Sequence, residues 1–551
     1  MHPKIAFHLI DRGVPFTLST VSPGSAHLQP IIGYDPIQGV YLVRDPYYPS
    51  VQDFLIDELS NHGKSFGPRC MALVPSDKAH LFNDLEFPAA TFYDLNFSLQ
   101  KSLNLHQRDD ALACLEQMKK QDSNHRLTLS GTRSIARYDS DYINELNCVD
   151  RLLEAFPEDL NLQTEKSALL ESLGRHQQQI SYLKEKAQKP DAHPYIVEAL
   201  ANAVRSDKRK AEYSAGLLRY VLYRQPTNAF ALWMLAGSFW DQEKRQKAFE
   251  LYRLCACLED KNEAYIETYF KAARYLKLQD QALADLQERV NKLGKKSFNP
   301  FECLFFAYRT LNQDQAAINT LLEAKKYHHK NEVLAKRLVE TYLANGMIVE
   351  AEDTLNKNCE NLGAIDKLEL KAAIASYNND WKQEKAFYEE LLENAPLHYK
   401  TIESLTCLLG HHQDEDSAVS FVEGRLTLNP TDPNLLFLKQ EWLFQKNSEE
   451  QERFARKIIS IHKNNSRAHI QLAFVLSTQA QEIANGPTQE TRLKRRDEKL
   501  AEAIANATTA YQINPLNTEN LLTLGDLYRR NEDNESAKRY YQEAIRYAVD
   551  T

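Results

Sequence analysis

Small and large apolar residues recur in a fixed order along most of the chain. In residues 521–544, Gly525 and Ala537 lie 12 positions apart, and Tyr528 and Tyr541 fall at helical intervals around them. This spacing predicts two packed helices, because small residues let the backbones approach while large side chains fill the space beside them. The same order recurs, with more substitutions, at residues 235–252, 338–355 and 405–422.

Prolines that close the repeats keep the same period. Pro226 and Pro396 are 170 positions apart, and Pro396 and Pro430 are 34 positions apart. A period of about 34 residues is typical of stacked helix pairs, in which each pair buries its apolar face against its neighbours. We therefore assign residues 81–551 to a helical solenoid of about a dozen pairs that begin near residue 90.

The last repeat carries a family resemblance. The segment NLLTLGDLYRRNEDNESAKRYYQEAI at residues 520–545 resembles the tetratricopeptide repeat consensus almost position by position. This resemblance implies a mainly α superhelix that binds proteins or peptides in a groove lined by the first helix of each pair. Aligned on Ala236, that face carries Phe230, Trp233 and Trp240, which are candidate binding residues because aromatic anchors dominate interface energetics. The alternative is that they pack against the neighbouring repeat.

Charge and composition exclude several classes of function. The 67 basic and 76 acidic residues give a net charge of −9, and no broad basic field is present to attract nucleic acid. No apolar run reaches the roughly 18 residues that span a bilayer, so we expect no membrane segment and a cytoplasmic location. Cys255 occupies the same packing position as Ala544, which indicates a buried small residue. We expect neither a metal site nor a cofactor.

One repeat contains an insertion near residues 480–497. The spacing from Pro430 to Pro515 is 85, which is two periods plus 17 residues. Gly486 and Pro487 predict a helix break within it. The basic residues that follow are Arg492, Lys494, Arg495 and Arg496. They predict a solvated helix face, with a phosphate or acidic partner as the alternative.

Residues 1–80 differ from the repeats and predict a small β-rich domain. Strands are expected at residues 16–20, 28–34 and 40–44, with the turn DPIQG between the last two. If the chain folds back around residues 36–37, His27 and Asp45 come nearly opposite one another on one face of the sheet. A carboxylate beside an imidazole orients the ring, as in systems that activate a nucleophile. The alternative is a polar pair that only caps the sheet.

The segment AHLQPIIGYDPIQGVYLVRDP resembles the His-to-Asp part of papain-like cysteine peptidases of the bacteriocin-leader (double-glycine) type. The resemblance implies a half-domain of α+β fold in which His27 is the general base and Asp45 orients it. That family places its catalytic Cys, after a Gln, on a helix N-terminal to the His, and no such residue precedes His27 here. Cys70 lies downstream, so it would serve only through a rearranged order.

These patterns together predict a scaffold or adaptor protein with a catalytically incomplete peptidase-like module. Because thiolate chemistry needs its nucleophile, we expect no peptidase activity from this chain alone. The main alternative is the C-terminal part of a cysteine peptidase whose Cys-bearing half lies upstream, with the repeats recruiting substrate. Self-association through the ends of the solenoid is a third possibility.

Overall fold

A computed structural model describes residues 3–22, 25–61, 65, 69–87, 89–205, 207–259, 262–358, 361–443, 448–484 and 490–550. The chain divides into two compact units. Unit 1 contains residues 1–186 and 452–549, and unit 2 contains residues 187–451 with 550–551. Unit 1 is therefore assembled from two stretches that are far apart in the sequence. No helix in the described ranges is long and apolar enough to cross a bilayer.

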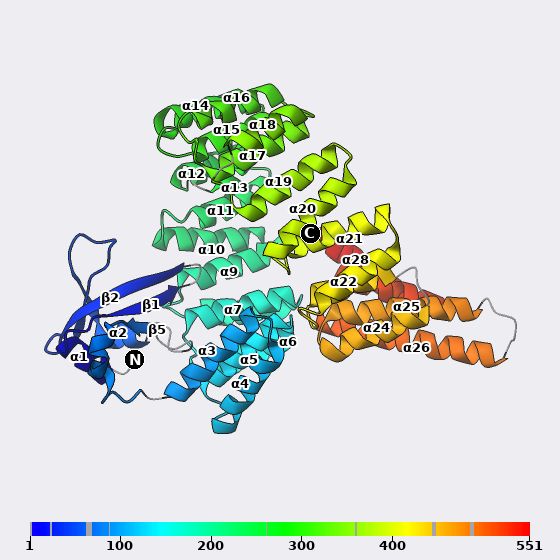
Figure 1. The fold of residues 1–551 in the computed structure, drawn as a ribbon, viewed down its shortest axis with the longest axis horizontal. Coiled ribbons are helices and arrows are strands. Elements are labelled where there is room, and N and C mark those ends of the chain that lie inside the picture. The colour runs from blue at the N-terminus through cyan, green and yellow to red at the C-terminus, as the bar shows by residue number, and fades with distance from the viewer. Residues whose placement is uncertain are drawn as a thin grey trace. The chain divides into compact units, whose positions relative to one another are not determined.

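Unit 1 begins with a five-stranded antiparallel sheet (Figure 1). Its strand order is β4-β3-β2-β1-β5. Helix α1 contributes the buried side chains Ala6 and Leu9 to the core of this domain, which also contains Ile31 and Val43. The elements of the domain are β1 (Phe16–Ser22), β2 (Ser25–Asp35), β3 (Val40–Val43), β4 (Gln52–Leu55), β5 (Arg69–Ala72), α1 (Pro3–Asp11), α2 (Ile56–Asn61) and the 3-10 helix η1 (Ser76–Phe82).

The three predicted strands are present, and β1 and β2 are longer than the sequence indicated. Alternating burial explains the prediction, because Phe16, Leu18 and Ile31 point into the core while their neighbours do not. Strand β4 was missed. It lies at the edge of the sheet, and the partly exposed pattern of Gln52–Leu55 gives no strong apolar alternation.

From Ala90 onward the described chain is helical, with 26 helices, α3 to α28, that follow one another as 13 pairs. The helices largely in unit 1 are α3 (Ala90–Asn104), α4 (Arg108–Gln121), α5 (Arg126–Tyr138), α6 (Tyr142–Ala155), α7 (Leu160–Ser172), α8 (His176–Ala187), α24 (Ser448–Ile461), α25 (Ser466–Ala484), α26 (Glu490–Ile513), α27 (Thr518–Arg530) and α28 (Asn534–Asp550).

Unit 2 contains the helices between these two stretches. They are α9 (Pro194–Arg205), α10 (Ala211–Arg224), α11 (Ala229–Asp241), α12 (Arg245–Leu258), α13 (Glu263–Tyr275), α14 (Gln279–Leu293), α15 (Asn299–Thr310), α16 (Asp314–Lys325), α17 (Glu332–Ala344), α18 (Ile348–Asn358), α19 (Ala364–Tyr377), α20 (Trp381–Asn394), α21 (Tyr399–His412), α22 (Glu415–Leu426) and α23 (Pro433–Trp442), with the 3-10 helix η2 (Lys208–Lys210) before α10.

The small residues that defined the repeat lie where two helices of a pair meet. Ala236 on α11 and Ala248 on α12 are both fully buried. In the last pair, a Cβ at Gly525 would lie 2.5 Å from Cε1 of Tyr541, so the glycine makes room for that ring. Close backbone approach at small residues is what the sequence pattern predicted.

A second periodic feature was not predicted from the sequence. Between the two helices of a pair, one turn residue adopts a left-handed conformation, with φ from 56° to 70°. This conformation ends the first helix and reverses the chain within a few residues. It recurs at His106, Ser140, Gly174, Glu243, Lys277, Asn312, Gly346, Asn379 and Glu532. Only two of these are glycines, so residue type gave no signal.

The insertion lengthens two helices of one pair. Helices α25 and α26 have 19 and 24 residues, whereas the helices of the preceding pair, α23 and α24, have 10 and 14. Gly486 and Pro487 lie outside the described residues. The additional residues therefore extend a helical hairpin, which is the orange pair in Figure 1.

The second stretch of unit 1 packs against the first. The His462 ring lies with Nδ1 3.0 Å from the carbonyl oxygen of Asp139, and Asn464 Nδ2 donates to the Asp141 carboxylate at 2.9 Å. Ile513 joins the buried cluster of Leu162, Leu169, Leu170 and Leu173 on α7 and the turn that follows it. Residues more than 300 positions apart therefore share one hydrophobic core.

Candidate functional site

His27 and Asp45 form the polar pair that the sequence predicted in the N-terminal sheet. Nε2 of His27 lies 2.7 Å from Oδ2 of Asp45. The Asp45 side chain is almost completely buried, while the His27 side chain is about half exposed at 49%. The Asp45 carboxylate, just after β3, is thus buried, and the imidazole it contacts remains open to solvent.

The strand register differs from the predicted one by about two residues. The turn occupies residues 36–39, with Gly39 at φ 68°, and the Arg44 N–H donates to the Pro30 carbonyl. By strand register Asp45 is therefore nearest to Gln29, and His27, whose ring makes the shorter contact, reaches it diagonally. The prediction that His27 and Asp45 lie nearly opposite one another is corrected in this respect, because the turn is longer than the one assumed, and the bulge after Ile31 offsets only part of the shift.

Gln29 is a member of the site that sequence reasoning missed. Its Nε2 donates to Oδ2 of Asp45 at 3.2 Å, and its side chain is buried. The Tyr47 backbone N–H donates to the other oxygen, Oδ1, at 2.9 Å. The Tyr47 N–H, followed by His27, holds the pKa of Asp45 below its usual range, since each favours the charged carboxylate.

Cys70 lies away from the His27–Asp45 pair. It lies on β5 opposite Leu18 of β1, and Leu18 lies in turn opposite Gln29 of β2. Two strand spacings of about 4.8 Å separate the cysteine from β2, which is beyond contact with His27. Burial also raises the pKa of the Cys70 thiol and disfavours its thiolate form.

The predicted binding residues of α11 are partly exposed and also pack against the neighbouring repeat, so they combine the two alternatives considered from the sequence. Phe230 is 39% exposed, and its ring lies 6.0 Å from that of Trp233. Trp233 is partly buried and contacts the next first helix, α13, where its Nε1 donates to Thr268 Oγ1 at 3.3 Å. Trp233 therefore bridges neighbouring repeats and remains partly exposed.

Trp240 forms a second aromatic cluster two turns along α11. Its ring lies edge-on to Tyr275 of α13 at 5.2 Å, and Tyr275 is 56% exposed. Arg245 lies over both rings and donates to the Tyr275 hydroxyl. Exposed and half-exposed aromatic side chains from two successive repeats thus lie together.

Side-chain contacts connect the first helices of unit 2 one after another. Trp233 reaches Thr268, Arg274 donates to the Thr310 carbonyl, and Arg337 pairs with Glu302. Lys336 then pairs with Asp366 and Glu369, and Lys400 pairs with Glu369. These partners lie 30 to 36 positions apart, which is about one repeat. The first helices therefore form one continuous face from α11 to α21.

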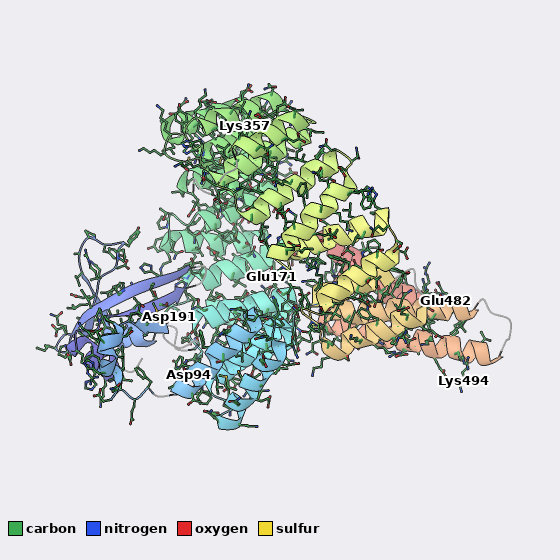
Figure 2. The ribbon with its side chains drawn as sticks, in the orientation of Figure 1. Asp94, Glu171, Asp191, Lys357, Glu482 and Lys494 are labelled. Atoms are coloured by element: carbon green, nitrogen blue, oxygen red, sulfur yellow. The ribbon has the colours of Figure 1, made fainter. Side chains whose placement is uncertain are left out.

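The basic residues of the insertion and Cys255 are the remaining candidates from the sequence. Lys494 lies near the N-terminal end of α26 (Figure 2), where Lys494 and Arg495 are exposed and Arg496 pairs with Asp497 at 2.8 Å. Cys255 is fully buried, as its packing position predicted. In the portion of the chain that the structure describes, no group of three or more His, Cys, Asp or Glu side chains could hold a metal ion.

Helix pairs with small residues at their contact, a period near 34 residues and a recurrent left-handed turn define the class of protein. The chain is a mainly α protein of tetratricopeptide-like helical repeats, with an N-terminal five-stranded antiparallel sheet.

The chain was compared with protein-family models, curated protein sequences and solved structures. No protein-family model and no curated protein sequence matches the chain. Yeast Tom70 is similar at 13% identity over 83% of this chain and 96% of that chain, with a TM-score of 0.31. The structure of Naa15/Naa10 bound to HypK-THB matches at 11% identity over 83% and 94%, with a TM-score of 0.34. A tetratricopeptide repeat protein from Parabacteroides merdae matches at 16% identity over 45% and 98%, with a TM-score of 0.27.

These TM-scores are too low to indicate that the chain shares an overall fold with any of the three proteins. The repeat assignment accordingly rests on the sequence period and on the helix pairs of this structure. None of these comparisons identifies the N-terminal sheet as papain-like.

Proposed function

We propose that this protein is a scaffold that binds protein or peptide partners on the face formed by the first helices of unit 2. The observation that carries the proposal is the aromatic surface of α11 and α13, where Phe230 and Tyr275 are exposed and Trp233 and Trp240 are partly exposed. Large aromatic side chains supply contact area at a small entropic cost, and they dominate binding where they cluster.

The packing of the two indoles also supports this role. Trp233 is fixed by Thr268 and by the ring of Tyr265, and Trp240 is fixed by Tyr252 and Tyr275. Side chains that are already ordered lose little conformational freedom when a ligand arrives. From the sequence, packing against the neighbouring repeat was an alternative to a binding role for these tryptophans. In the structure the same packing orders the two side chains, and this order favours binding.

Co-purification from the native cell extract tests the proposal. The double variant Trp233→Ala/Trp240→Ala should lose the partners that the wild-type chain retains, while circular dichroism shows unchanged helicity. Trp381→Ala is the matched control, because Trp381 stacks on His412 at the start of α20 and lies outside the α11–α13 surface. Partners that stay bound to the double variant would exclude this surface as the binding site.

For the N-terminal domain we propose a catalytically incomplete, peptidase-like module. His27, Asp45 and Gln29 would supply a base and its orienting groups, and Cys70 is too distant and too buried to act as nucleophile. The second candidate is a cysteine peptidase whose nucleophile comes from an upstream segment or another chain. Incubation of the purified chain with peptide substrates should give no cleavage that a thiol alkylator abolishes, and reproducible alkylator-sensitive cleavage would overturn the first reading.

The exposed cysteines bear on the cellular compartment in which the scaffold acts. The exposed Cys257 and Cys407 are free thiols. Free exposed thiols suit a reducing compartment. We therefore propose that the scaffold acts in the cytoplasm.

A further inference from the structure

Two arginine side chains lie against the two tryptophans of α11. The Arg205 guanidinium, from α9, lies 5.8 Å from the ring centre of Trp233. The Arg245 guanidinium, from the start of α12, lies 5.7 Å from the ring centre of Trp240 and 4.4 Å from that of Tyr275. Each end of the aromatic surface therefore carries one cation.

The position of Arg205 depends on the absence of a side chain at residue 237. A Cβ at Gly237 would lie only 2.4 Å from a guanidinium nitrogen of Arg205. Any larger residue in this place would displace the guanidinium. Gly237 thus opens the space in which Arg205 crosses from α9 to α11.

Neither arginine has an acidic partner in the part of the chain that the structure describes. No carboxylate lies within ion-pair distance of Arg205 or Arg245, and Asp241 on the same helix pairs with neither. Farther along the first helices the situation is the opposite, because Arg337, Lys336 and Lys400 are all paired with carboxylates. Arg205 and Arg245 are therefore available to form an ion pair with an acidic group of a ligand.

A guanidinium stacked on an aromatic ring can keep its N–H edge free, as Arg205 does, whereas Nη1 of Arg245 already donates to Tyr275 and its Nε is buried, which leaves its second Nη nitrogen for a ligand. A free N–H edge is shaped to donate two parallel hydrogen bonds to a carboxylate, and the ring beneath it holds the fork in place. These two guanidinium groups supply positive charge beside the aromatic rings, which is complementary to an acidic ligand.

We propose that the surface of α9, α11 and α13 binds an extended acidic peptide in which a large apolar side chain is flanked by carboxylates. This inference rests on the proposed function and names its partner class. The apolar side chain would pack on Phe230 and Trp233, and the carboxylates would bind Arg205 and Arg245. Trp233 and Trp240 are seven residues apart, about 10 Å along α11, which an extended peptide spans in about three residues.

A library of random 12-residue peptides displayed on phage and selected on the full chain tests the proposal. The enriched peptides should place Asp or Glu within four positions of Phe, Leu or Trp. A selected peptide, synthesised with a fluorophore, should bind about tenfold more weakly to Arg205→Gln and to Arg245→Gln. Its binding to wild type should also weaken as salt is raised.

Arg219→Gln is the matched control, because Arg219 is an exposed arginine of α10 that pairs with Glu212. Peptides without enriched acidic residues, or equal binding to Arg205→Gln and Arg219→Gln, would overturn the charge assignment while the scaffold role stands. If every selected peptide binds Trp233→Ala/Trp240→Ala as tightly as wild type, or if no peptide is selected, the surface itself is excluded as a peptide site.

Discussion

The indole of Trp442 occupies the space that a side chain at Gly410 would need. A Cβ built on Gly410 would lie 2.0 Å from Cη2 of Trp442, an atom in the rigid ring. Gly410 lies on α21 and Trp442 on α23, so the contact joins the first helices of two successive pairs. Gly410 sits inside a helix and adopts no left-handed conformation, so its backbone does not require glycine. The requirement comes from the Trp442 ring of the neighbouring repeat.

Gly410→Ala should therefore destabilise unit 2 although alanine favours helix. Overpacking costs typically 1–3 kcal/mol, and about 1 kcal/mol of helix propensity offsets part of it, so we expect a net loss of up to about 2 kcal/mol in urea unfolding. Gly424→Ala is the control, because nothing lies within 4 Å of a Cβ at that helical position. It should stabilise by about 0.5–1 kcal/mol, and equal effects of the two substitutions would contradict the packing argument.

Asp45→Ala should loosen the start of the loop after β3. The Asp45 carboxylate accepts the Tyr47 N–H, so the variant should show faster hydrogen exchange at that amide by mass spectrometry. Asp53→Ala, at an exposed position of the same sheet, should leave it unchanged.

The Asp45 carboxyl group should also make the stability of the protein depend on pH in a defined direction. Because the folded pKa of Asp45 is lowered, the stability it contributes is complete above the ordinary value of 3.8 and is lost as the pH falls through the lowered folded value. The difference between wild type and Asp45→Ala should therefore disappear in acid. A difference that grows on acidification would show that the carboxylate is not stabilised in the folded state.

Two cysteines that are two positions apart should differ sharply in reactivity. Cys255 is fully buried and its pKa is raised to about 12 from 9.0, because burial disfavours the thiolate. A shift of three units lowers the thiolate population about a thousandfold. Iodoacetamide should modify the exposed Cys257 in the native protein and reach Cys255 only after unfolding, which peptide mapping can measure. Equal labelling would contradict the placement of Cys255 in the pair core.

A buried ion-pair network in unit 1 should be sensitive to the loss of one carboxylate. Glu165 on α7 pairs with Arg133 at 2.9 Å and with Arg137 at 2.6 Å, and the Arg133 side chain is only 9% exposed. Burial lowers the pKa of Arg133. Glu165→Ala should cost about 3–5 kcal/mol, since it removes the carboxylate that forms the ion pair with the buried Arg133.

The control for this network is an exposed ion pair on α4. Glu116 pairs with Lys119 at 2.8 Å, and more than two fifths of each side chain is exposed. Glu116→Ala should change the unfolding midpoint little. If Glu165→Ala is equally mild, water reaches the network around Arg133.

The helical repeats could be predicted from the sequence because their packing uses residue size at fixed spacing. Gly525, Ala236 and Ala248 each lie where helices meet, and the substitution of a small residue by a large one there is sterically excluded. The left-handed turns could not be predicted in the same way. Residues such as Glu243 and Lys277 are held in that conformation by the helices on either side, and nothing in their own chemistry favours it.

The candidate sites were predictable only in part. His27 and Asp45 were found because strand alternation places residues of equal parity on one face. Gln29 was missed because its role depends on the length of the turn, which shifts the register by two residues. The partners of Trp233 and Trp240 were missed for another reason, since Arg205 and Arg245 come from other helices and only the packing of successive pairs brings them there.

The divided construction of unit 1 has a consequence during synthesis. Asn514 donates to the carbonyl of Ser172, a partner 342 residues earlier in the chain. At about 5–20 residues per second on the ribosome, roughly 20 to 70 s pass between the two. The leucines of α7 leave the exit tunnel long before Ile513 can cover them, so the nascent chain carries an uncovered apolar surface while all of unit 2 is made. A chaperone that binds nascent chains would find the apolar face of α7 accessible during this interval.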